Sequence, residues 1–314
     1  MGDETYVSLD QFLIPGKKFY VLSDKEKPPN EHRDFTDSRY LIMNHLKFSI
    51  CWALILNFLT INCREPPIAG KITNGQTANE KDFPYIVVII GQHLIKGGKV
   101  ITFGAGAMLS DKWIVTSKNV VFLVVNDKIK AKKTLMVLPK YNNNAQNYRT
   151  KPKFGVEKVF CSNRSDLKGD LTLLKLKHPI PLSDNIKPIK IINKVGNLKT
   201  LRMTGWGMTD PQNETHQFQA LQQAEIELNG GSCGQSCRVK FEASNGKHPN
   251  ACYGDEGGPV VTKVNETGPD VLVGLITGFD ENCRNYSVFL NISTYKPWIN
   301  DMMSGEPEKY RCGP

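Results

Sequence analysis

The chain has 314 residues, enough for one or two well-buried globular domains. Its 40 basic residues outnumber its 31 acidic residues, which gives a formal net charge of +9. Such a balance can mark a polyanion partner, but the charge is spread along the chain and no basic motif is interleaved with aromatic residues. Composition therefore argues against a nucleic-acid-binding protein. The densest basic cluster is the one candidate contact for another polyanion, and it consists of Lys128, Lys130, Lys132 and Lys133.

The chain begins with 42 mostly polar residues of unknown role, which precede an apolar segment at residues 43–63. The apolar core of that segment runs from Phe48 to Ile61, whereas a membrane span needs about 20 residues. This length favours a signal peptide, and Met43 is a suitable start for it. Residues 1–42 would then be an upstream extension of the gene model, and an internal signal or short anchor is the alternative. We expect a secreted, extracellular protein.

Cysteine usage agrees with an oxidising compartment. Two of the eight cysteines, Cys51 and Cys63, lie in or at the end of the signal segment, which leaves six for three disulfides. If Cys63 stays in a propeptide, its thiol is unpaired or tethers that propeptide. N-x-S/T sequons fit a secreted surface and supply five candidate glycosylation sites: Asn163, Asn213, Asn265, Asn285 and Asn291.

Residues 64–71 read REPPIAGK, an exposed linker or short propeptide suited to cleavage. From residue 72 onward, short apolar, β-branched runs alternate with turn signals, which predicts an all-β sandwich or barrel. The segment STYKPWINDMM near the end is the exception and predicts one C-terminal helix. The runs that we expect to be strands are 85–90, 113–117, 134–138, 171–176, 271–276 and 287–293.

The motif CYGDEGGPVV at residues 252–261 describes a glycine-dense loop that can aim backbone N–H groups at a small target. With serine at position 256 it would contain GDSGGP, a well-known nucleophile loop. Five other strings occur in a fixed order: KITNG (71–75), WIVTS (113–117), DLTLLKL (170–176), MTGWG (203–207) and YKPWIND (295–301). Together they make residues 72–314 resemble the trypsin- or chymotrypsin-like serine proteases. That resemblance implies two packed six-stranded antiparallel β-barrels, with a C-terminal helix and a substrate cleft between the barrels.

The resemblance also implies a degenerate catalytic triad. Asn119, in the string TSKNV, stands where the family has its histidine, and an amide cannot accept and return a proton near neutral pH. Asp170 is retained, but Glu256 replaces the serine nucleophile. Attack by a carboxylate on a peptide carbonyl would need an activation that nothing here supplies. We therefore predict that the chain has no catalytic residues and is not an enzyme.

The substrate pocket implied by the resemblance departs from the family as well. Asn250 stands at the base of the specificity pocket, where a trypsin-like enzyme would have an aspartate. The family's S-W-G strand corresponds to Thr277, Gly278 and Phe279. A phenylalanine in place of a glycine is expected to crowd the mouth of the pocket.

The resemblance implies that two disulfides are kept, Cys252–Cys283 and Cys233–Cys237, which leaves Cys161–Cys312 as a third pair by elimination. A further family disulfide is lost at both ends, because Val120 and Gly104 stand at its two positions.

The family's activation step is retained in outline. Cleavage after Lys71 would free the amine of Ile72, which in the family pairs with the carboxylate that corresponds to Asp255. The alternative is that these three residues are inherited features that no longer act.

The leading hypothesis is a secreted serine protease homologue without catalysis, similar to insect members of the family. It would bind extracellular proteins, such as active serine proteases or their substrates, as a cofactor or regulator. One alternative is a hydrolase of altered chemistry that uses Asp170 and Glu256, and another is a polyanion-binding protein. No cofactor and no metal are expected in the leading hypothesis.

Overall fold

The computed structural model describes thirteen parts of the chain. They are residues 7–14, 17–24, 72–95, 98–125, 132–139, 152–162, 171–194, 198, 200–207, 220–227, 238–242, 249–265 and 267–312. Several predictions fall outside these ranges: the signal segment 43–63, the linker 64–71 with Lys71, the residues Lys128, Lys130 and Asp170, the pair Cys233–Cys237, and the sequons at Asn163 and Asn213.

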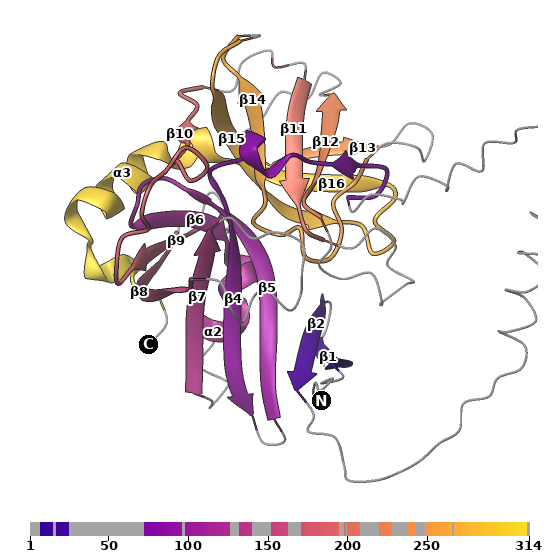
Figure 1. The fold of residues 1–314 in the computed structure, drawn as a ribbon, viewed down its shortest axis with the longest axis vertical. Helices are drawn as coiled ribbons and strands as arrows, with labels where there is room; N and C mark the ends of the chain where they lie inside the picture. Colours follow the sequence, from indigo (N-terminus) through magenta and orange to yellow (C-terminus); the bar gives the residue numbers. More distant parts are fainter. Residues whose placement is uncertain are drawn as a thin grey trace, which may run out of the picture. The chain divides into compact units, whose positions relative to one another are not determined.

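The first sheet contains a closed six-stranded antiparallel barrel (Figure 1). The strands run in the order β5-β4-β7-β8-β9-β6, and pairing of β5 with β6 closes the ring. Its interior is filled by alternating apolar side chains, including the fully buried Ile89, Ile114 and Leu174. The six strands are β4 (Ile86–Ile95), β5 (Gly98–Met108), β6 (Trp113–Ser117), β7 (Lys132–Pro139), β8 (Phe154–Cys161) and β9 (Leu171–Leu176).

A hairpin from the polar N-terminal stretch continues this sheet. It consists of β1 (Val7–Ile14) and β2 (Lys17–Asp24), and β2 pairs with β5 through Leu22 and Ile101. Part of the stretch expected to be an extension of unknown role therefore has regular β-structure.

The second sheet has the order β13-β16-β15-β14-β11-β12-β3, and β10 pairs with β15 in parallel. Its core includes Met203, Val260 and Phe289, all fully buried. The strands are β3 (Gln76–Thr77), β10 (Lys190–Ile191), β11 (Thr200–Gly205), β12 (Gln222–Glu227), β13 (Arg238–Glu242), β14 (Pro259–Lys263), β15 (Asp270–Phe279) and β16 (Tyr286–Asn291). The all-β, trypsin-like fold class predicted from the sequence is confirmed.

The predicted C-terminal helix is α3 (Lys296–Gly305). Trp298, Ile299 and Met302 form its buried face, and the helix ends at Glu306, which adopts the left-handed conformation. A second helix, α2 (Lys118–Val125), was not predicted from the sequence. The described residues also form three short 3₁₀-helices: η1 (Glu80–Asp82), η4 (Ile292–Tyr295) and η5 (Glu308–Tyr310). Among the residues described, no helix is long and apolar enough to cross a membrane.

The C-terminal tail is fastened to the first barrel. Cys312 forms a disulfide with Cys161 at the end of β8. Glu306, which follows α3, forms ion pairs with Lys158 on β8 and Lys175 on β9. Both lysines also donate hydrogen bonds to the Glu306 carboxyl. The bond from Lys175, followed in size by the bond from Lys158, holds the pKa of that carboxyl below its ordinary value.

Candidate functional site

The loop at residues 252–258 folds into two successive tight turns. The N–H of Asp255 donates to the carbonyl of Cys252, and the N–H of Gly258 donates to the carbonyl of Asp255, each at 2.9 Å. Gly254 and Gly257 have φ values of 96° and 75°, which only glycine adopts without strain. This is why the sequence needs glycine on both sides of the two carboxylates.

Asp255 is fully buried and organises the base of the loop. One carboxylate oxygen accepts the N–H of Gly207 at 2.7 Å, and the other accepts the N–H of Cys252 at 2.9 Å. A Cβ atom on Gly207 would lie 2.4 Å from the Asp255 carboxyl carbon, and one on Gly205 would lie 2.0 Å from its oxygen. The glycines of the MTGWG string therefore make room for this carboxylate.

Ile72 is also fully buried, and it packs in the core of the second sheet. Its φ is 67°, a left-handed value that is unusual for a β-branched residue. The next residue, Thr73, pairs with Asn250 through two backbone hydrogen bonds of 2.9 and 3.1 Å. The start of the protease-like domain is thus held against the core of the second sheet.

Glu256 folds back onto its own loop. Its Oε2 atom accepts the backbone N–H of Gly254 at 2.9 Å. Its carbonyl oxygen accepts the N–H of Ala105 on β5, also at 2.9 Å. The carboxylate at the expected nucleophile position is thus hydrogen-bonded to the N–H two residues before it.

Asn119 is the second residue of α2, directly after strand β6. Its Nδ2 atom donates to the carbonyl oxygen of Thr277 on β15 at 3.1 Å. The structure therefore brings two of the predicted site positions together, although they are 158 residues apart in the chain. The amide acts there as a hydrogen-bond donor to a backbone carbonyl.

Asn250 is buried, and both ends of its side-chain amide are bonded. Nδ2 donates to the carbonyl of Arg284 at 3.0 Å, and Oδ1 accepts the hydroxyl of Ser287 at 3.2 Å. The residue at the expected base of the substrate pocket thus cross-links β16 and the turn before it.

Phe279 packs against Tyr253 in an edge-to-face arrangement, with ring centroids 5.1 Å apart. Both rings lie against the Cys252–Cys283 disulfide. Burial, and then the neighbouring Glu281 and Glu256 carboxylates, raise the pKa of the Tyr253 phenol. Sequence reasoning singled out Phe279 but not the tyrosine that receives it.

Val120 and Gly104 meet at the position of the missing disulfide. A Cβ atom on Gly104 would lie only 2.6 Å from a methyl carbon of Val120. The valine side chain therefore occupies the space of the lost disulfide.

The candidate glycosylation sites that the structure describes differ in exposure. Asn265 and Asn285 are exposed. Asn291 is buried, and its side-chain oxygen accepts the N–H of Ser293 as the N-cap of η4, a position without space for a glycan. Across the described ranges, no three His, Cys, Asp or Glu side chains gather in a way that could hold a metal ion.

Comparison with known proteins agrees with this geometry. The family model described as Trypsin matches residues 72–299. Serine protease grass of Drosophila melanogaster is 24% identical over 265 residues, which cover 76% of this chain and 69% of that protein. Coagulation factor IX of Oryctolagus cuniculus is 26% identical over 250 residues, which cover 73% of this chain and 83% of that protein. Because the family model spans more than half of the chain, this protein belongs to the trypsin family.

Proposed function

We propose that this chain is a secreted serine protease homologue without catalysis, and that it binds extracellular proteins as a cofactor or regulator of proteolysis. The observation that carries the proposal is the hydrogen bond from the Gly254 N–H to the Glu256 carboxylate. In trypsin-like enzymes, the N–H two residues before the nucleophile is one of the two donors that stabilise the oxyanion of the reaction intermediate. A carboxylate on that donor both occupies it and places a negative charge where the intermediate would develop one. Two like charges 4 Å apart repel by about 4 kcal/mol near a protein surface.

The position of the general base supports the same proposal. The amide of Asn119 cannot take up a proton at neutral pH, and it donates to the Thr277 carbonyl. In a serine-protease series, loss of the nucleophile or the base alone lowers turnover by roughly 10⁶-fold. A chain that lacks both has no route to an acyl-enzyme intermediate.

The environment of Asn250 argues against a conventional substrate pocket. Both polar ends of the side chain bond to the protein itself, to Arg284 and Ser287. A substrate side chain would have to displace these bonds to reach the amide, at a cost of about 1–3 kcal/mol for each buried group left unpaired.

Secretion is part of the proposal. The Cys161–Cys312 and Cys252–Cys283 disulfides fit an oxidising compartment. The apolar segment at residues 43–63 and the exposed sequons at Asn265 and Asn285 point the same way.

Cleavage after Lys71 also belongs to the proposal, as a step that alters the binding surface. The freed ammonium of Ile72 would compete with the N–H of Gly207 for the buried Asp255 carboxylate. We expect the cleaved chain to unfold at a measurably different temperature from the intact chain. Identical unfolding temperatures would show that the switch is no longer used.

The test of the proposal is turnover of a peptide library by the chain cleaved after Lys71. Glu256→Ala supplies the background rate, since it removes the carboxylate at the expected nucleophile position. We expect equal, background-level rates for both proteins. A rate in the unmodified chain that disappears in Glu256→Ala would show that the glutamate takes part in hydrolysis.

A second experiment separates loss of the catalytic residues from loss of the substrate site. Glu256→Ser combined with Asn119→His restores both side-chain types. We expect no recovery of turnover, because Asn250 and Phe279 remain in place. Strong peptidase activity in this double variant would refute the account of the pocket and leave the two substitutions as the whole defect.

A further inference from the structure

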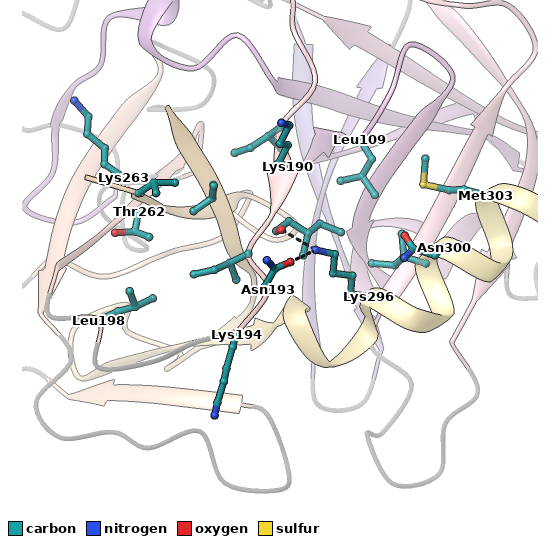
Figure 2. Close-up of a pocket in the computed structure, with 16 residues that line it drawn as sticks. Leu109, Lys190, Asn193, Lys194, Leu198, Thr262, Lys263, Lys296, Asn300 and Met303 are labelled. Carbon is teal, nitrogen blue, oxygen red and sulfur yellow. Dashed lines mark hydrogen bonds between the residues drawn. The ribbon is translucent and has the colours of Figure 1, made fainter. Parts of the chain in front are cut away.

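A pocket of about 710 Å³ opens on another part of the protease-like domain (Figure 2). Its walls come from the segment around β10, from β14 and the start of β15, and from helix α3. It shares no lining residue with the candidate functional site. Nothing in the proposed catalytic defect explains it.

The pocket has an apolar floor. Ile189 and Ile299 are buried beneath it, and Leu198 and Met303 line it while only partly buried. Val264 stands at its edge with 65% of its surface exposed, the highest value among the large exposed apolar residues described. Apolar surface gathered in a concave site is typical of places where a ligand or a partner chain buries it.

Lysines surround this floor. Lys190, Lys194, Lys263 and Lys296 all line the pocket, and no Asp or Glu is among its lining residues. Figure 2 shows the Lys194 and Lys263 side chains extending outward at opposite edges. Lys296 instead reaches across the floor, where its ammonium donates to Asn193 and to the carbonyl of Ile191. The pocket therefore presents positive charge from several sides, and charge complementarity calls for an anionic occupant.

The remaining polar lining groups are neutral. They are the amides of Asn193 and Asn300 and the hydroxyl of Thr262. Amides and hydroxyls can pair with the N–H and C=O groups of an extended peptide. A sulfated glycan could use the lysines, but it has no apolar side chains to place on the floor.

We infer that this pocket docks a short acidic peptide segment of a partner protein, in which acidic side chains alternate with apolar ones. The apolar side chains would cover the floor, and the carboxylates would meet the lysines at the rim. The inference rests on the proposed binding function, but its test measures binding and does not depend on turnover.

The probe is a fluorescein-labelled decapeptide in which Glu alternates with Leu. Two matched peptides carry Gln in place of Glu or Ser in place of Leu. We expect saturable binding of the Glu–Leu peptide to the full chain, weakened by added salt, and at least about tenfold weaker binding of both matched peptides. Equal binding of the Ser-containing peptide would overturn the inference, because it would mean that charge alone attracts the probe. Absence of saturable binding of the Glu–Leu peptide would overturn it too.

Variants of the chain test the location. Lys194→Glu combined with Lys263→Glu should weaken binding of the probe by about tenfold or more. The control, Lys81→Glu with Lys177→Glu, makes the same change in net charge at exposed lysines outside the pocket and should leave binding within about twofold. Equal losses in both double variants would assign the binding to net charge and overturn the site.

The apolar floor has its own matched pair. Val264→Ser removes an exposed apolar side chain at the pocket, and Leu182→Ser removes one that is 53% exposed elsewhere. We expect Val264→Ser to weaken binding of the probe by about fivefold and Leu182→Ser to leave it unchanged. Neither variant should alter the retention of the chain on heparin. If Val264→Ser leaves binding of the probe unchanged and heparin displaces the probe completely, the pocket is a polyanion surface. That result would contradict a peptide site. A chain that hydrolyses peptides and still binds the probe would overturn the proposed function alone.

Discussion

The candidate catalytic site and the lysine-lined pocket use their polar groups in opposite ways. In the first, the side chains of Asn119 and Glu256 bond to the protein's own backbone. In the second, lysines stand around an apolar floor, and Lys194 and Lys263 extend outward. The difference is that the polar side chains of the candidate site bond within the fold, whereas lysines line an apolar pocket elsewhere on the domain.

The largest expected effect is at Asp255, the buried carboxylate that organises the base of the loop. Asp255→Ala leaves the buried N–H groups of Gly207 and Cys252 unpaired, so we expect the free energy of unfolding to fall by about 3–5 kcal/mol. Urea unfolding followed by tryptophan fluorescence measures it. The neighbouring Glu256→Ala, at a half-buried position, is the control and should cost about 1 kcal/mol or less. Similar small losses in both variants would show that Asp255 no longer organises the loop.

The position of the missing disulfide, between residues 104 and 120, allows a variant that should stabilise the fold. In Gly104→Cys combined with Val120→Cys, the two Cβ atoms would start about 3.1 Å apart, slightly closer than in natural disulfides. A bond across the 15 intervening positions should raise the free energy of unfolding by about 3 kcal/mol. Mass spectrometry without reductant detects the bond, and Val120→Cys alone is the control. Two free thiols in the double variant would contradict the close contact between α2 and β5.

Acid should weaken the loop that carries Asp280. Burial by itself raises the pKa of this carboxyl, but the N–H groups of Asn285, Tyr286 and Arg284 outweigh it and hold the pKa below the ordinary value. A lowered folded-state pKa means that the carboxylate stabilises the fold above its unfolded pKa of about 3.9. That contribution disappears as the pH falls through the folded pKa.

Asp280→Asn should therefore cost about 1–3 kcal/mol at pH 7 and progressively less as the pH falls below about 4. Unfolding in urea at a series of pH values measures this difference. Asp184→Asn is the control, because the Asp184 side chain is 98% exposed and its substitution should cost no more than about 0.5 kcal/mol at pH 7. If the cost of Asp280→Asn does not change with pH, the lowered pKa of the Asp280 carboxyl in the folded chain is contradicted.

A smaller effect is expected at Asn119. Asn119→Ala removes the hydrogen bond to the Thr277 carbonyl and should lower the free energy of unfolding by about 1 kcal/mol. Differential scanning calorimetry of the variant and the unmodified chain measures it. No change at all would mean that water replaces the amide without cost.

We expect the smallest change in the free energy of unfolding at the rim of the lysine-lined pocket. Lys194→Glu with Lys263→Glu changes exposed side chains, and we expect the free energy of unfolding to stay within about 0.5 kcal/mol. Thermal unfolding of the double variant measures it. A larger loss would mean that these lysines support the fold, which would remove the contrast with the candidate functional site.

Much of the fold could be predicted because short apolar runs map directly onto strands. The string WIVTS coincides with β6, and LTLLKL coincides with β9. Strand β5 escaped prediction because its sequence, GKVITFGAGAM, contains glycines that weaken a strand pattern. Helix α2 escaped because it is short and rich in β-branched residues, and Val120 and Val121 are held there by burial in the barrel core.

At the candidate site, the sequence predicted which residue types had changed but not where their side chains would bond. The side-chain amides of Asn119 and Asn250 donate to backbone carbonyls 158 and 34 residues away, which only the folded chain brings together. The lysine-lined pocket could not be predicted at all, because its walls come from strands and a helix that are far apart in the sequence.

The hydrogen bond between Gly254 and Glu256 is the contact on which the account depends most. Amide hydrogen exchange of Gly254, followed by NMR in the ¹⁵N-labelled chain at pH 7, measures it directly. The account predicts a slowly exchanging amide that speeds up by about tenfold or more in Glu256→Ala, because the carboxylate acceptor is gone. Equal, fast exchange in both proteins would contradict it, since the N–H would then be available to an oxyanion.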